Sequence, residues 1–283
     1  MATNALTVAR DDFLNAARSH VVLGVVGAFV VSVALVFLAE MDLFADPYRT
    51  LNDVALLFIL VGPVLLAPLS YLAVAGDRAS GRLKYVMGLP ASRPGYVAAK
   101  VASRAGVAVA AVLASLAVGF AVALAAFENA PDPAAFALFA VASALYVATF
   151  VCIFVAISAS VTGRSRAMFG AVAVYFVLVP FWLGVTPPLT LGTLLSAVGD
   201  LLGTGLSAST REFVDALSPL RAYGGLIRPV FAQGAEKYER FAHMGGAPDA
   251  VYERAWFHVA VLLAWSLGSV TVGYLRFRRA ELA

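Results

Sequence analysis

The sequence predicts an all-α membrane protein with six transmembrane helices, and three observations lead to that fold class. The chain has 283 residues, of which 61% are hydrophobic and only 13% are charged, about half the charge of an average soluble domain. Its mean hydropathy is +0.88. Several of its apolar stretches approach or exceed the roughly 20 residues that a helix needs to cross a bilayer. We therefore expect a multi-pass protein of the cell membrane.

Residues 1–20 are expected to form an amphipathic interfacial helix ahead of the first span. The segment NALTVARDDFLNAARSH mixes charges with apolar side chains, and its arginines suit a membrane surface. The first span is expected at about 21–39. A signal peptide would have a shorter apolar core and a small-residue cleavage site, whereas this run ends in Leu38-Ala39-Glu40-Met41. We therefore predict a retained span within a transmembrane domain over residues 21–283.

The second span is expected at about 54–75, after the capping-box-like spacing of Thr50 and Asp53. It contains Pro63 and Pro68, and proline removes a backbone hydrogen bond and bends a helix. Such a kink either lines a pathway or serves packing.

The third span, expected at about 105–127, carries small residues four positions apart. Such rows let helix backbones approach closely in lipid. One row is Ala111, Ser115, Gly119 and Ala123, and a second is Gly106, Ala110 and Ala114.

The last three spans are expected at about 134–161, 167–186 and 255–275. Asp132-Pro133 is typical of an N-cap followed by proline in the first helical turn. Residues 187–254 form an extracytoplasmic helical segment in this prediction. Its apolar part, 188–206, is either interfacial or re-entrant, and Ser209 with Glu212 indicates a capping box for a following helix.

Charge next to the spans predicts that both termini are cytoplasmic. Among the short loops assigned to the outside, only Arg49 is basic, whereas the loops assigned to the inside carry most of the arginines and lysines. A further span at 188–206 would place the RFRR sequence at 276–279 outside. Because the bases lie at span ends, they indicate orientation rather than nucleic-acid binding.

The cytoplasmic loop 76–100, GDRASGRLKYVMGLPASRPGYVAAK, is the most basic segment of the chain. Its only acid is Asp77. Leu83, Val86 and Met87 give it an apolar face as well. A short amphipathic helix with an exposed apolar face needs a cover, either the membrane surface or a partner protein.

The sequence shows no motif for chemistry of its own. It has no HExxH, no GxSxG, no metal-type Cys/His spacing and no P-loop. Its single cysteine, Cys152, lies in an apolar run. The spans carry almost no ionisable groups at depth, which argues against a proton- or ion-coupled transporter. This leaves a membrane body that is expected to bind no cofactor and has no engine of its own, and an engine supplied by another chain would fit.

The chain resembles the permease subunits of ABC-2 type ABC transporters, and most closely the NosY-like group. The resemblance starts with the amphipathic entry VARDDFLNAARSH and extends to SPLRAY at 218–223. Its main part is the pattern of an acid, a glycine, an apolar pair, a proline, a small residue and an arginine, with a lysine later. The matching positions are Asp77, Gly81, Leu83, Val86, Pro90, Ser92, Arg93 and Lys100.

The resemblance implies an exporter whose coupling helix, within 77–93, docks in a groove of a separate ABC ATP-binding subunit that holds ATP and magnesium. It also implies a dimer with a second permease copy or a related permease. Asp77 stands where the family more often has Glu, and Arg82 where a small hydroxylated residue is common. The expected docking residues are Asp77, Arg78, Gly81, Arg82, Leu83, Val86, Met87, Pro90 and Arg93.

Two alternatives stay open at this point. The basic loop could instead lie on anionic lipid. The protein could also be a membrane anchor or assembly factor, or an intramembrane enzyme, that works through segment 187–254. The substrate is open among drugs, lipids, peptides and species used in metal-centre assembly.

Overall fold

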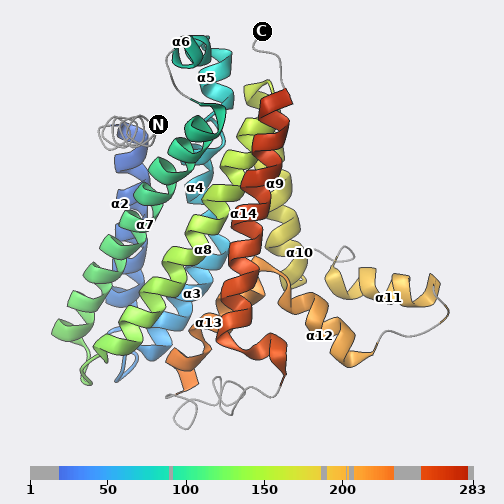
Figure 1. Ribbon diagram of the computed structural model, residues 1–283. Coiled ribbons are helices and arrows are strands. Elements are labelled where there is room, and N and C mark those ends of the chain that lie inside the picture. Colours follow the sequence, from blue (N-terminus) through green and yellow to red (C-terminus); the bar gives the residue numbers. More distant parts are fainter. Residues whose placement is uncertain are drawn as a thin grey trace.

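The computed structural model is a bundle of long helices (Figure 1), and it describes residues 19–88, 92–185, 190–201, 203, 207–232 and 250–279. Within these ranges all regular structure is helical. Five helices among the described residues are long and apolar enough to cross a membrane, and there are six spans if the bent helix pair crosses as one. The predicted all-α membrane fold is confirmed. The interfacial helix expected over residues 1–20 lies almost wholly outside the described residues.

Three spans have bounds near those expected from the sequence. They are α2 (His20–Glu40), α8 (Pro133–Ser160) and α14 (Ala255–Arg279). The Asp132 carboxylate accepts hydrogen bonds from the N–H groups of Ala134 and Ala135 at 2.9 and 3.3 Å. This is the N-cap that the sequence indicates, and it fixes where α8 begins.

The second span is broken into α3 (Tyr48–Leu60) and α4 (Gly62–Ser70), with a bend of 40° at the break. The helix begins at Tyr48 rather than near residue 54. Thr50 is therefore buried within α3 instead of capping it. Arg49 and Asp53, one turn apart, form an ion pair at 3.5 Å.

The break follows from Pro63, which has no N–H to donate to the carbonyl of Ile59. Two tyrosines from other helices supply donors at this point. The Tyr175 hydroxyl donates to the Leu60 carbonyl at 2.9 Å, and the Tyr146 hydroxyl lies 3.5 Å from the Ile59 carbonyl. Pro63 itself is buried, so the bend is packed within the bundle.

The third span is the long helix α7 (Arg93–Ala126), which begins well before residue 105. The Ser92 hydroxyl accepts from the Gly95 N–H at 3.2 Å, and a proline occupies the first turn. The first predicted row of small residues is buried. At Gly119 an added Cβ would lie 2.7 Å from the Phe37 ring, so α7 and α2 approach closely there.

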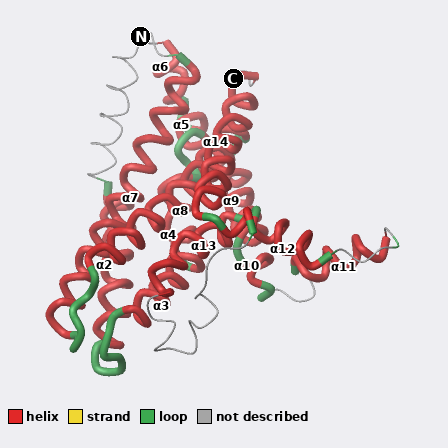
Figure 2. The backbone as a smooth tube through the Cα atoms, turned by 60° about the horizontal axis from the view of Figure 1, so that its bottom comes forward, coloured by secondary structure: helices red, strands yellow, loops and turns green. Residues whose placement is uncertain are grey.

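The fifth span divides at a proline into α9 (Arg164–Leu178) and α10 (Pro180–Leu183). It is followed by α11 (Leu191–Leu201), α12 (Ala208–Ala216), α13 (Pro219–Ala232) and the short 3₁₀ helix η2 (Val251–Glu253). Figures 1 and 2 both show α11 and α12 extending sideways from the bundle. The α12 N-cap is Ser207, which accepts from the Thr210 N–H at 3.2 Å, rather than Ser209.

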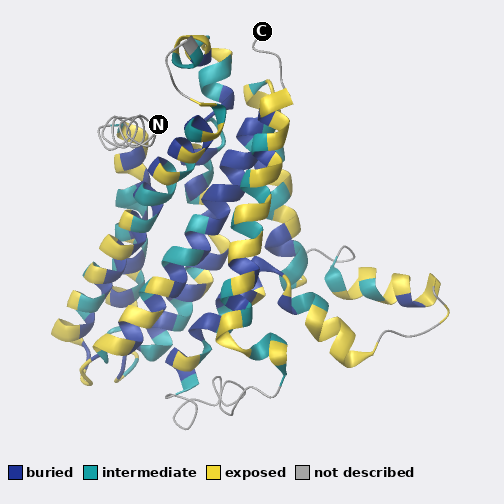
Figure 3. Ribbon diagram, viewed as in Figure 1, coloured by how far each residue is buried: buried dark blue, intermediate teal, exposed yellow. Residues whose placement is uncertain are grey.

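Helix α8 is the centre of the molecule, because it packs against α14, α7, α13 and α4. Figure 3 shows that it is also the most continuously buried of the long helices. Its Tyr146 stacks on Tyr223 of α13 with ring centroids 4.7 Å apart, and Ser143 hydrogen-bonds the Tyr223 hydroxyl at 2.8 Å. These contacts hold α13 onto α8.

One end of the bundle brings together segments from the whole chain (Figure 1). It contains α5 (Ala75–Ala79), α6 (Arg82–Gly88), the start of α7, the α8–α9 turn and the end of α14. We refer to it as the α5/α6 end. The basic loop singled out by the sequence therefore lies where several spans converge.

Candidate functional site

The predicted coupling loop folds into two short helices, α5 and α6, at the tip of this end (Figure 1). Gly81 separates them with a φ of +75°, a left-handed conformation that glycine adopts without a steric cost. The start of α5 is fixed from α8, because the Ser158 hydroxyl accepts from the N–H groups of Val74 and Ala75 at 3.0 and 2.9 Å. The turn and this contact set the position of the loop.

Asp77 connects α5 to the first turns of α7. Its carboxylate accepts a hydrogen bond from the Tyr96 hydroxyl at 2.7 Å and pairs with the Lys100 ammonium at 3.0 Å. The side chains of Lys100 and Asp77 are only 7% and 15% exposed. Water screens such a pair little, so the attraction is stronger than in an ion pair on the surface.

Arg78 connects α5 to α8 and α14. It donates from Nη1 to the Val161 carbonyl at 2.7 Å, just past the end of α8. Its guanidinium carbon also lies 5.6 Å from the centre of the Phe277 ring, within the range of a cation–π contact. The same ring contacts α7, because Tyr96 stacks on Phe277 with ring centroids 5.9 Å apart.

Arg93 completes the connections at this end. It donates from Nη1 to the Arg278 carbonyl at 2.6 Å and so joins the start of α7 to the last turn of α14. A cation at the C-terminal end of a helix is also favoured by the helix dipole. The sequence places Asp77, Arg78 and Arg93 in one loop, and in the structure Asp77 contacts α7, Arg78 contacts the end of α8 and α14, and Arg93 contacts α14.

The two sides of α6 differ sharply. Leu83 is 2% exposed and belongs to the continuous buried core, and Val86 and Met87 are partly buried against that core. Leu83 therefore packs within the chain rather than presenting itself to a groove elsewhere. Arg82 and Lys84 are exposed, and Tyr85 is 82% exposed. Pro90 lies outside the described residues.

Tyr85 is the residue that the sequence argument passes over. A large aromatic side chain so fully exposed, with a cation on an adjacent position and no acid within α6, is typical of a contact surface. Spacing alone shows which residues share a helical face. It does not show which of the two faces the bundle covers.

The described residues offer no alternative site based on a metal cluster. In those ranges no group of three His, Cys, Asp or Glu side chains lies close enough to hold an ion. Cys152 is buried. His258 packs against α13 so tightly that a Cβ added at Gly225 would overlap its imidazole ring.

Comparison with known families gives a match over nearly the whole chain. The model described as "ABC-2 family transporter protein" matches residues 6–282. No curated protein gives a significant match. The family consists of membrane transport components that are not catalytic themselves and work with an ABC ATP-binding partner. This favours the transport prediction over an anchor or an intramembrane enzyme, while the NosY-like group stays a prediction. The chain belongs to the ABC-2 transporter family and is the multi-pass permease subunit of an ABC transporter.

Proposed function

We propose that α5 and α6 form the coupling element on which a separate ATP-binding subunit docks, and that the α5/α6 end is cytoplasmic. One observation carries the proposal. Asp77 and Arg78 attach α5 to α7, α8 and α14, while α6 leaves a cationic and aromatic surface uncovered. The concentration of arginine and lysine at this end supports the orientation.

The docking surface consists of Arg82, Lys84 and Tyr85. It fits a partner groove that is apolar at its centre and acidic at its rim, because tyrosine buries a large area at a small entropy cost and arginine suits an interface. Leu83, Val86 and Met87 have a second part in this proposal, which is to hold α6 against the bundle. Gly81 supplies the turn that presents α6, and Pro90, which lies outside the described residues, stays a predicted docking residue.

Asp77, Arg78 and Arg93 transmit the movement. Nucleotide-driven closure of the partner displaces α5 and α6, and the partly buried contacts pass the displacement to α7, α8 and α14. A rigid shift of packed helices between two arrangements is a common way to open one side of a transporter and close the other. ATP and magnesium are bound by the partner alone.

We further propose that the transporter is an exporter and that two permease chains, identical or related, enclose its pathway. Both statements rest on the family resemblance of loop 77–93. The exposed apolar side chains on α2 and α9, among them Leu23, Leu35 and Phe169, need cover from lipid or from another permease chain.

Separate variants test docking and transmission. Tyr85→Asp is expected to lower co-purification of the ATP-binding subunit by roughly tenfold or more, as for a central interface residue. Asp77→Asn is expected to retain the complex and lose most transport, because docking remains while the link to Lys100 is lost. Arg211→Glu, at an exposed position on α12, is the matched control for a surface charge change.

The proposal fails if Tyr85→Asp and Lys84→Glu both keep wild-type complex formation and transport. Transmission through α5 fails separately if Asp77→Asn keeps the complex and full transport. The two results are measured on the same purified complex, by subunit stoichiometry and by transport into vesicles.

A further inference from the structure

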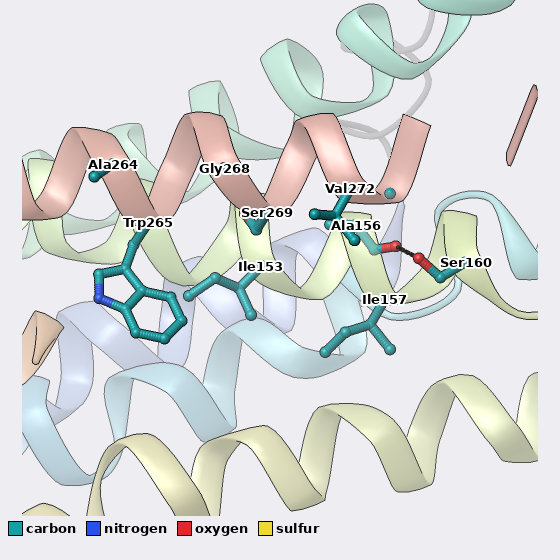
Figure 4. Close-up of a pocket in the computed structure, with 10 residues that line it drawn as sticks. Ile153, Ala156, Ile157, Ser160, Ala264, Trp265, Gly268, Ser269 and Val272 are labelled. Carbon is teal, nitrogen blue, oxygen red and sulfur yellow. Dashed lines mark hydrogen bonds between the residues drawn. The ribbon is translucent and has the colours of Figure 1, made fainter. Parts of the chain in front are cut away.

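A groove of about 570 Å³ runs along α8 and α14 (Figure 4). The side chains of Ile153 and Ile157 from α8 and Trp265 from α14 point into the same space. Val272 is 56% exposed, so the groove is open at the surface of the bundle. Its volume lies in the range of about 300–1,000 Å³ that is usual for small-molecule sites.

The polar atoms along the groove are satisfied by the chain itself. The Ser160 hydroxyl donates to the Ala156 carbonyl at 2.8 Å, and the Ser269 hydroxyl donates to the Ser266 carbonyl at 3.1 Å. The Trp265 indole N–H donates to the Leu217 carbonyl at 2.9 Å. No donor of this lining is left to recognise a polar ligand, so the groove suits an apolar occupant.

The walls of the groove are firmly packed, while its centre is open. At Gly273 an added Cβ would lie 2.7 Å from the Ala156 Cα, so α8 and α14 touch there. At Gly170 an added Cβ would lie 2.7 Å from Ile157, which places α9 beside the groove. At Gly268, by contrast, nothing lies within 4 Å of an added Cβ. The groove is therefore a stable space between close-packed helices.

The groove has the length of one lipid leaflet. Its α14 lining spans residues 264–273, which is roughly 14 Å at 1.5 Å per residue. Half of the hydrocarbon core of a bilayer is about 15 Å thick. Because Ser160 and Gly273 lie toward the α5/α6 end of their helices, the groove belongs to the leaflet at that end.

The end of the groove at this leaflet is basic. Arg276 follows Val272 by one turn on α14, and the exposed Arg164 begins α9 beside the groove. No Asp or Glu occurs in residues 160–166 or 274–279. Within the part of the chain that the structure describes, Asp77, paired with Lys100, is the acid of this end. Within the described residues, a second copy of this chain therefore brings no exposed acid from its own α5/α6 end, whereas a lipid phosphate is anionic.

We propose that the groove binds one acyl chain of an anionic phospholipid, whose phosphate lies between Arg164 and Arg276. Under the proposed orientation the lipid comes from the cytoplasmic leaflet. The apolar lining receives the chain, and the two guanidinium groups pair with the phosphate oxygens. This site does not depend on docking of the ATP-binding subunit, since α6 is not part of it.

Photocrosslinking in nanodiscs tests the proposal on the full chain. The probe is a phosphatidylglycerol with a diazirine near the end of one acyl chain, and phosphatidylcholine with the same chain is the zwitterionic arm. Peptide mass spectrometry is expected to place most of the anionic label on 153–160 and 264–273. Labelling by the phosphatidylcholine probe is expected to be clearly weaker.

Matched variants sharpen the test. Gly268→Leu adds a side chain where an added Cβ meets nothing within 4 Å, and it is expected to fill the open centre and abolish most of the label. Gly24→Leu, another glycine with nothing within 4 Å of an added Cβ, is expected to leave it unchanged. Arg164→Gln and Arg276→Gln are each expected to lower it about fivefold, the effect of one cation near an anionic headgroup. Arg254→Gln, exposed at the opposite end of α14, is their control.

Three results would overturn the proposal. The first is labelling spread evenly over all lipid-facing helices, including exposed Leu23 and Leu35 of α2. The second is equal labelling by the anionic and zwitterionic probes. The third is efficient cross-linking between two copies through Val272→Cys in a Cys152→Ala background, which would make the groove a protein interface. If Gly268→Leu proves unstable, the Arg164→Gln and Arg276→Gln variants still test whether the groove binds an anionic lipid.

Discussion

Tyr96 contacts several helices at once, which its position in a basic loop does not indicate. Its hydroxyl donates to Asp77, its ring stacks on Phe277, and the Lys100 ammonium lies 5.6 Å from the centre of the same ring. One side chain therefore contacts α5, α7 and α14 together. At this scale the site depends on a few enclosed charges whose partners come from other helices.

Removing Lys100 is expected to destabilise the protein markedly. Lys100→Met leaves the Asp77 carboxylate enclosed without its cation, and breaking a buried pair in this way costs about 3–5 kcal/mol. Arg49→Gln breaks an ion pair whose side chains are 30% and 27% exposed, and such pairs contribute about 1 kcal/mol or less. Thermal unfolding in detergent, followed by size-exclusion chromatography, compares the two. Equal unfolding midpoints for the two variants would show that the Asp77–Lys100 pair contributes no more to stability than the Arg49–Asp53 pair.

The broken second span is the element with the clearest internal cause. Pro63 removes a backbone donor, and tyrosines from α8 and α9 contact the two carbonyls beside the break. The bend is therefore specified from both sides, by a missing N–H in the span and by hydroxyls in its neighbours. Pro68, by contrast, lies inside the continuous helix α4.

Pro63→Ala is expected to reduce the bend, because it restores an N–H that can bond to the Ile59 carbonyl. Spin labels at the exposed positions Leu56 and Ala79 measure the change as a longer distance between the two halves of the span. Pro68→Ala is the control and is expected to leave this distance unchanged. If both variants give the wild-type distance distribution, the surrounding helices alone set the bend.

At the scale of the whole molecule, the arrangement gives a definite topology to test. The proposed orientation places Lys84 in the cytoplasm and Thr210 of α12 outside. In a Cys152→Ala background, Lys84→Cys is expected to react with a membrane-impermeant maleimide only after the cells are opened. Thr210→Cys is expected to react in intact cells. The reverse pattern would invert the protein in the membrane and place the coupling element outside.

The features that sequence could predict depend on local pattern. The spans follow from apolar length, the start of α8 from Asp132 and Pro133, and the close approach of α7 to another helix from its row of small residues, although the sequence does not identify that helix as α2. The early start of α7 had a local signal too, since Ser92 followed by Arg93 and Pro94 is an N-cap with proline in the first turn. This signal is easily missed, because the charged residues in 93–104 make the segment look unlike a transmembrane span.

The rest depends on contacts between distant residues, which no periodicity encodes. Ser158 caps a helix more than eighty positions earlier in the chain, and Tyr175 bonds a carbonyl 115 positions away. The division of α6 into a covered Leu83 and an exposed Tyr85 likewise depends on where the bundle lies. The sequence alone is compatible with docking through either Leu83 or Tyr85. Only the fold assigns one inward and the other outward.

The attachment of α14 to α7 has a consequence for biogenesis. The Arg278 carbonyl that accepts a hydrogen bond from Arg93 lies 185 residues further along the chain. Tyr96 and Arg78 both contact the ring of Phe277, which is also in α14. During synthesis the contacts of the α5/α6 end therefore stay incomplete until α14 has been made and inserted. Under the docking proposed above, the ATP-binding subunit is expected to bind finished permeases, and a nascent or truncated chain is expected not to compete for it.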